Sequence, residues 1–189
     1  WCAGVRIALL HKCDWSRNDT LHSRPDTLLD YLQHELFTSL SAELTEAWRV
    51  LAHLPRFNAR LCEHLFGAGE GAQCLKTLQE LGCFIEPWQD SADWLQIFPP
   101  LTQLMRDEQW STGRSWHRRA CQWFAAEQLW KPAFEQALLA EEYEVAVSLL
   151  QHFSFEHLFE EQTVVLLLRL HEQQGAELLS GSPQLVGLI

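Results

Sequence analysis

The sequence predicts a mainly α-helical fold that contains one small β-hairpin. Apolar residues recur at helical spacing through most of the 189-residue chain. Two short strand patterns, CFIEPW and WLQIF, interrupt these helices, and the turn-forming stretch QDSAD joins them. The loops between the later helices are short, which favours antiparallel neighbouring helices.

The amino-acid composition is that of a folded globular protein. Of the residues, 47% are hydrophobic, 21% are charged and 9 are tryptophan, which argues against intrinsic disorder. The chain opens on WCAG, without an initiator Met or a signal peptide, and we interpret it as a fragment of a larger protein. No apolar run approaches the roughly 18 residues of a membrane span. We therefore expect no membrane partner and a cytoplasmic location.

Cysteine and histidine spacing predicts neither a disulfide framework nor a metal site. The six cysteines include no C-x-x-C pair, which favours free, buried thiols in a reducing cytoplasm. The nine histidines form no H-x-x-x-H pattern and no mixed Cys/His cluster. His53 and His117 lie in apolar helical patterns, so we expect them within the core or at its boundary.

The net charge of −11 bears on possible partners. Nucleic-acid binding depends largely on Lys and Arg side chains that neutralise phosphates, and this chain has 14 basic residues against 25 acidic ones. The densest basic cluster is Arg114, Arg118 and Arg119, on a predicted helix that also carries Trp116 and Trp123. This spacing is typical of a solvated helix face beside a core face.

The first half of the chain has the element order of a winged helix. Helices are predicted over 1–12, 27–40, 44–54, from Asn58 to before Gly67, and over 72–81 with Gly82 as the terminating glycine. The β-hairpin follows at 83–98. Three helices followed by a hairpin are typical of a winged helix, which we place at residues 41–108.

The second half is predicted to be entirely helical. Pro99 and Pro100 follow the last strand directly; Pro99 favours an extended Phe98, and a proline is tolerated in a first helical turn. Antiparallel helical hairpins, similar to tetratricopeptide (TPR-like) repeats, are expected over 109–189. The stretch TVVLLLRLHEQQ at 163–174 predicts a helix buried on most sides.

The possible catalytic patterns all have a plainer interpretation. GAGEG at 67–71 lacks the preceding strand and the Gly-Lys-Ser/Thr of a phosphate loop, so it predicts a turn. The adjacent pairs Glu141–Glu142 and Glu160–Glu161 would diverge on a helix and are interpreted as solvated faces. We predict no catalytic residue, no metal ligand and no cofactor-binding residue in this chain.

The third helix of the predicted winged helix is poorly suited to DNA. A recognition helix in the major groove needs basic or amide side chains that reach base edges. Here the helix offers only Lys76 as a base, Glu80 opposes it, and the wing QDSAD has two aspartates. A winged helix used for packing or regulation is favoured, and a DNA-binding winged helix remains the alternative.

Several stretches, in this order, resemble one protein family. They are W-x-A-G-x-R-x-A-L (Trp1, Ala3, Gly4, Arg6, Ala8, Leu9), LQELGCF (Leu78 to Phe84), IFP followed by LMR (Ile97 to Pro99, Leu104 to Arg106), WHRRACQWF with AFEQALLA (including His117, Ala120, Trp123, Ala133, Ala137, Leu138 and Ala140), and SPQLVGL near the end. The chain resembles the region after the nucleotide-binding core in MalT-like, LuxR-type ATP-dependent transcriptional regulators of the STAND class.

The resemblance implies a domain organisation and partners. Residues 1–40 would be a helical segment from the end of the nucleotide-binding module, 41–108 the winged helix, and 109–189 a helical-hairpin arm leading into a repeat sensor domain. ATP or ADP is expected for the full-length protein, whose ATPase core and DNA-binding helices would lie outside this chain. The implied partners are that core, the sensor domain and other copies of the protein.

Four residues are singled out for this regulatory role. Phe98 occupies the position where relatives carry a nucleotide-sensing histidine, and a phenyl ring cannot donate a hydrogen bond to a phosphate. Trp1, Trp48 and Trp88 are candidates for an interaction surface. A stand-alone helical-repeat scaffold is a further alternative, for which the hairpin at 83–98 would be absent.

Overall fold

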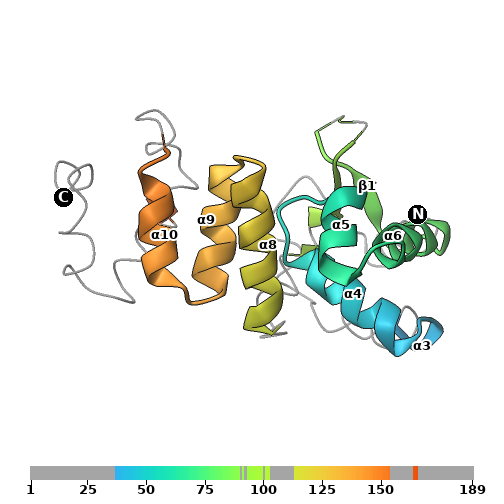
Figure 1. Ribbon diagram of the computed structural model, residues 1–189. Coiled ribbons are helices and arrows are strands. Elements are labelled where there is room, and N and C mark those ends of the chain that lie inside the picture. Colours follow the sequence, from blue (N-terminus) through green and yellow to red (C-terminus); the bar gives the residue numbers. More distant parts are fainter. Residues whose placement is uncertain are drawn as a thin grey trace, which may run out of the picture. The chain divides into compact units, whose positions relative to one another are not determined.

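The computed structural model describes residues 37–89, 91, 93–99, 101–102, 113–153 and 164–165 (Figure 1). The chain divides into two compact units, Trp1–Ser111 and Thr112–Ile189. The helix predicted over 1–12 and most of the one over 27–40 lie outside the described residues, as does Trp1.

The helices of the first unit whose bounds the structure describes lie close to their predicted positions. They are α3 (Phe37–Ser39), α4 (Ala42–Ala52), α5 (Ala59–Phe66) and α6 (Glu70–Glu80). Ser41 caps α4 by accepting a hydrogen bond of 3.2 Å from the amide of Leu44. Asn58 caps α5 as predicted, with its Oδ1 atom 2.9 Å from the amide nitrogen of Leu61.

The end of α6 confirms the terminating role of Gly82. Gly82 has a φ of 70°, a left-handed conformation that costs a glycine little. Its amide donates to the carbonyl of Gln79 and the amide of Cys83 donates to that of Leu78, each at 3.0 Å. This pair of bonds is the Schellman motif that commonly ends a helix.

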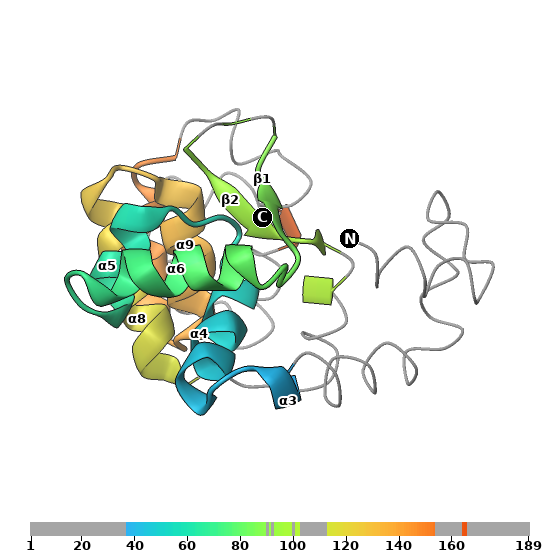
Figure 2. The same cartoon turned by 90° about the vertical axis from the view of Figure 1, so that its right-hand side faces the viewer.

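The predicted hairpin is present after α6. Strands β1 (Ile85–Pro87) and β2 (Leu95–Ile97) are antiparallel, with Ile85 opposite Ile97. The sequence did not predict a third participant: Phe57 pairs with Leu95 through two backbone hydrogen bonds of 2.8 Å. Figure 2 shows the hairpin beside α4, α5 and α6, the arrangement of a winged helix.

The core of the first unit joins the helices to the hairpin. Its largest fully buried side chains are Trp48, Leu51, Phe57, Leu61, Leu65, Leu78, Ile97 and Leu101. They come from α4, the Phe57 segment, α5, α6, β2 and the helical residues after β2, so burial of apolar area stabilises all of these elements together. The strand-to-helix junction is also as predicted, because Pro99, Leu101 and Thr102 are helical and the Leu101 amide bonds the Phe98 carbonyl at 2.9 Å.

The part of the second unit that the structure describes is a stack of helices, as predicted. Helices α8 (Arg114–Ala126), α9 (Trp130–Leu139) and α10 (Tyr143–Leu150) lie side by side and are joined by short turns (Figure 1). Ala120, Phe124, Ala133, Phe134, Ala137 and Ala146 are fully buried between them. Val164 and Val165 are helical but 39% and 46% exposed, so the prediction of a helix buried on most sides is wrong at these two positions.

Two turns of the second unit have a left-handed residue that is not glycine. Gln128 follows α8 with a φ of 59°, and Glu141 follows α9 with a φ of 57°. Both occupy the position that Gly82 has after α6, and both turns show the same pair of backbone hydrogen bonds. The sequence did not reveal these helix ends because it lacks the usual glycine.

Candidate functional site

The wing between β1 and β2 is held by backbone and aromatic contacts. The Trp88 amide donates to the Trp94 carbonyl at 2.9 Å, and Ser91 Oγ accepts from the amide of Trp94 at 3.2 Å. Arg56, just before the Phe57 bridge, places its guanidinium 4.4 Å from the ring centroid of Trp88 and 4.6 Å from that of Trp94. Such stacking of a cation on two indoles orders the base of the wing.

Of the three tryptophans proposed for an interaction surface, the structure describes two, and of these Trp88 is partly exposed. Trp48 is 0% exposed, and its indole N–H donates to the carbonyl of Cys83 at 2.8 Å. A side chain buried in this way cannot contact a partner, so its assignment to a surface is wrong. Trp88 is half-buried on the wing, and Trp1 lies outside the described residues.

Phe98 lies at the last position before the junction helix. Its amide donates to the carbonyl of Phe84 at 2.9 Å, and its side chain is half-buried. The backbone of Phe98 is therefore part of the hairpin end, while its ring offers only apolar surface to a partner. Its correspondence to a nucleotide-sensing position stays a prediction.

The exposed face of α6 does not carry the chemistry of a DNA-reading helix. Lys76 and Glu80 lie one turn apart with 3.8 Å between charged atoms, and their side chains are 68% and 63% exposed. In the wing strands, Glu86 Oε1 accepts a hydrogen bond of 2.9 Å from Gln96. Acidic residues outnumber basic ones between residues 33 and 114, so this region repels phosphate groups more than it attracts them.

The glycine-rich segment at 67–71 is a turn only over residues 67–69, because Glu70 and Gly71 already belong to α6. An internal carboxylate occupies backbone donors of this segment. Glu63 of α5 accepts hydrogen bonds from the amides of Gly69 and Ala72, the latter at 2.7 Å. The first turn of α6 thus has an anion from its own chain, which satisfies free N–H groups and the helix dipole. A phosphate would have to displace this carboxylate.

The described cysteines are free thiols with suppressed acidity. Cys62, Cys83 and Cys121 are buried and Cys74 is half-buried. Burial raises the pKa of Cys62 to about 12, and those of Cys83 and Cys121 to about 11. These thiols are protonated at neutral pH and are poor nucleophiles.

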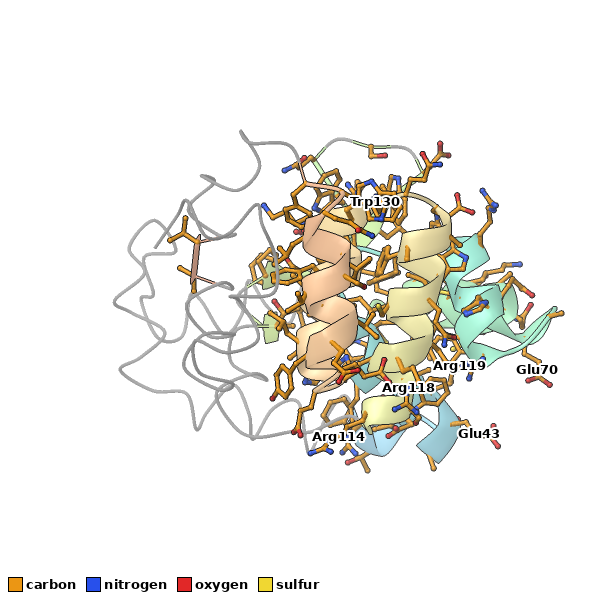
Figure 3. The ribbon with its side chains drawn as sticks, turned by 60° about the vertical axis from the view of Figure 1, so that its left-hand side comes forward. Glu43, Glu70, Arg114, Arg118, Arg119 and Trp130 are labelled. Atoms are coloured by element: carbon orange, nitrogen blue, oxygen red, sulfur yellow. The ribbon has the colours of Figure 1, made fainter. Side chains whose placement is uncertain are left out.

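Two arginines of the α8 cluster, labelled in Figure 3, pair with the turn between α9 and α10. Arg114 pairs with Glu141, and Arg118 pairs with Glu142. Glu141 is exposed, as interpreted, but the placement of the pair on a helix is wrong: Glu141 is the left-handed residue of the turn, and Glu142 precedes α10. Arg119 lies 5.2 Å from the ring centroid of Trp116. The pair Glu160–Glu161 lies outside the described residues.

Both singled-out histidines are buried. His53 is 7% exposed and its Nδ1 lies 2.8 Å from the carbonyl oxygen of Arg49. His117 is 5% exposed and donates through Nδ1 to Gln136 Oε1 at 2.8 Å, which links α8 to α9. In the described part of the chain, no group of three or more His, Cys, Asp or Glu side chains is arranged to hold a metal ion. The helices of that part are also too short or too polar to cross a membrane.

Comparison with known proteins identifies the first unit. Residues 33–114 match the family model of the MalT winged helix domain. A search of curated proteins finds no match to the chain. The family match covers α3 to α6, both strands and the Arg56–Trp88–Trp94 stack, and the observed fold agrees with it. Residues 33–114 therefore match the MalT winged helix domain in sequence and have a winged-helix fold, in agreement with the resemblance to MalT-like regulators.

Proposed function

We propose that this chain is the regulatory and interaction module of a MalT-like, LuxR-type transcriptional regulator of the STAND class. It couples nucleotide state and effector sensing to self-association and transcription activation. The observation that carries the proposal is the match of residues 33–114 to the MalT winged helix domain. The domain is a non-catalytic module, and the ATPase chemistry is assigned to a core outside this chain.

The proposed mechanism is a lever. At rest, the winged helix packs on the ADP-bound core, and residues 1–40 connect the two. Effector binding to a sensor domain beyond the helical arm (residues 109–189) releases the winged helix and permits self-association in the cytoplasm. Phe98 would contribute apolar contact at the core rather than a hydrogen bond to the nucleotide.

The lever can be tested with the nucleotide-binding core as a separate protein. Calorimetric titration of this chain into the core is expected to give tighter binding with ADP than with an ATP analogue. Equal affinity in both nucleotide states would contradict the mechanism.

The wing offers a way to locate the contact. Trp88→Ala should weaken binding to the ADP-bound core, since Trp88 is a half-buried aromatic residue on the wing. Because this change also removes the stack on Arg56, Arg56→Met serves as the control for wing order. If both variants lost the same binding affinity, the effect would come from a less ordered wing and not from a direct contact between Trp88 and the core.

The DNA-binding alternative has the winged-helix fold in its favour. Fluorescence anisotropy with duplex DNA at low salt decides the question, and we expect no binding at micromolar protein. Micromolar binding with a steep salt dependence would favour the alternative. The stand-alone helical scaffold required the absence of the hairpin, which is present at β1 and β2.

A further inference from the structure

Helix α8 begins without the local features that most strengthen a helix start. Gly113 is its N-cap residue and has no side chain to accept a hydrogen bond from the free amides. The first turn contains no acidic residue and starts with Arg114, whose positive charge is unfavourable at the positive end of the helix dipole. Helix α4 shows the contrast, because Ser41 caps it and Glu43 lies in its first turn.

Two long-range ion pairs offset this local disadvantage. Arg114 and Arg118 are four residues apart and therefore share one face of α8. Their partners Glu141 and Glu142 are consecutive in the turn that follows α9. Figure 3 shows both arginines at the N-terminal part of α8, away from the end at which Trp130 lies.

The turn that carries the glutamates has a defined backbone. The amide of Glu141 donates to the Leu138 carbonyl at 3.0 Å, and that of Glu142 donates to the Ala137 carbonyl at 2.9 Å. Glu141 has a φ of 57°, a conformation that a non-glycine residue adopts at a cost. The turn therefore holds two neighbouring carboxylates in place for the two arginines.

We infer that these two ion pairs form a latch that controls whether the first turn of α8 is folded. The division between the two units lies between Ser111 and Thr112, directly before Gly113. Opening of the latch releases residues 114–116, which precede the buried His117, from α8 into the connection between the units. Because an extended residue spans about 3.4 Å and a helical one about 1.5 Å, three released residues lengthen that connection by roughly 6 Å. This device is independent of the proposed regulatory function.

Hydrogen exchange on the whole chain tests the latch. The amides of residues 117–120 report on the first turn, and those of residues 134–138 in α9 serve as an internal reference. In Glu142→Gln the first-turn amides should exchange about two- to five-fold faster, the range that a weakened surface ion pair and helix dipole imply. The reference amides should keep their rates. Glu141→Gln combined with Glu142→Gln should give a larger effect, and added salt should act in the same direction.

A matched variant and a rescue complete the design. Glu144→Gln removes the same charge from the first turn of α10 while both ion pairs remain, so the α8 amides should be unaffected. Gly113→Asp, added to Glu142→Gln, should restore the protection by capping the helix. The backbone permits it, because φ and ψ at Gly113 are −57° and 139° and, among the described residues, an added Cβ comes within 4 Å of Ser115 Oγ alone, at 3.6 Å.

Three outcomes would overturn the inference. The first-turn amides could be unchanged in Glu142→Gln, which would make the ion pairs irrelevant to the helix start. They could exchange equally faster in Glu144→Gln, which would show that the loss of one negative charge near α8, and not the loss of an ion pair, causes the effect. All amides of the unit could accelerate together, which would make the ion pairs a contribution to global stability alone.

Discussion

At the scale of single residues, Gly71 marks a close approach of two helix backbones. A Cβ atom added at Gly71 would lie 2.2 Å from the backbone carbon and oxygen of Cys62, and 2.3 Å from the amide nitrogen of Glu63. The backbones of α5 and α6 therefore meet where α6 has no side chain. Backbone atoms cannot move aside without separating the two helices.

We expect Gly71→Ala to destabilise the first unit by about 3 kcal/mol, the upper range for an overpacked core. Gly69→Ala is the matched control: no atom of the described residues lies within 4 Å of its added Cβ, but its φ of 83° should cost about 1 kcal/mol. Urea unfolding followed by tryptophan fluorescence measures both. A similar loss in the two variants would show that the close approach to Cys62 is not the limiting contact.

A second residue-scale prediction concerns Gln128. Because Gln128 is left-handed after α8, Gln128→Gly should stabilise the protein by about 1 kcal/mol. Gly82→Ala, at the equivalent position after α6, should destabilise it by a similar amount. The midpoints of urea unfolding give both values, and opposite signs for the two changes are the essential result.

At the scale of elements, Trp48 connects α4 to the hairpin. Its indole N–H bonds the Cys83 carbonyl, at the point where the chain leaves α6 for β1. Trp48→Phe would leave that buried carbonyl unsatisfied, so we expect a loss of about 1–3 kcal/mol in unfolding free energy. Trp116→Phe, on a half-buried residue of α8, should leave the first unit unchanged. If the first unit of Trp48→Phe had the same unfolding free energy as that of the unchanged chain, this role would be contradicted.

The elements themselves were largely predictable from local signals. The helices α4, α5 and α6 follow apolar spacing, and Asn58 and Gly82 mark ends that the structure confirms. The pairing of Phe57 with Leu95 was not predictable, because a bridge of one residue pair has no periodicity. The contacts of Glu141 and Glu142 were missed for a related reason: their partners lie more than 20 residues away in sequence.

At the scale of the whole molecule, buried thiols make stability depend on alkaline pH. The pKa of Cys62 is raised by burial to about 12, and those of Cys83 and Cys121 to about 11, from an ordinary value of 9.0. Below pH 9 the thiols are protonated in both the folded and the unfolded chain, and their contribution to the free energy of unfolding is fully present. Above pH 9 the unfolded chain loses them first, so the free energy of unfolding falls as pH rises towards 11–12.

The slope of this loss gives the test. Each thiol contributes at most about 1.4 kcal/mol per pH unit in this window. Cys62→Ala should therefore reduce the decline in unfolding free energy between pH 9 and pH 10.5, measured by urea titrations at each pH. Cys62→Ala also creates a cavity, but the cavity lowers the unfolding free energy equally at every pH. The cavity therefore does not contribute to a change in slope. An unchanged slope would show that Cys62 does not titrate differently in the folded state.

By itself, the sequence determined the helices, the hairpin and the acidic character of the winged helix, and it pointed to the MalT family. These properties follow from residue order and composition alone, because helical spacing, caps and turns are local. Only the tertiary structure showed that Trp48 is core while Trp88 is half-buried on the wing, and that Glu63 caps α6. Which groups meet a side chain depends on how distant segments pack, and local sequence does not encode that packing.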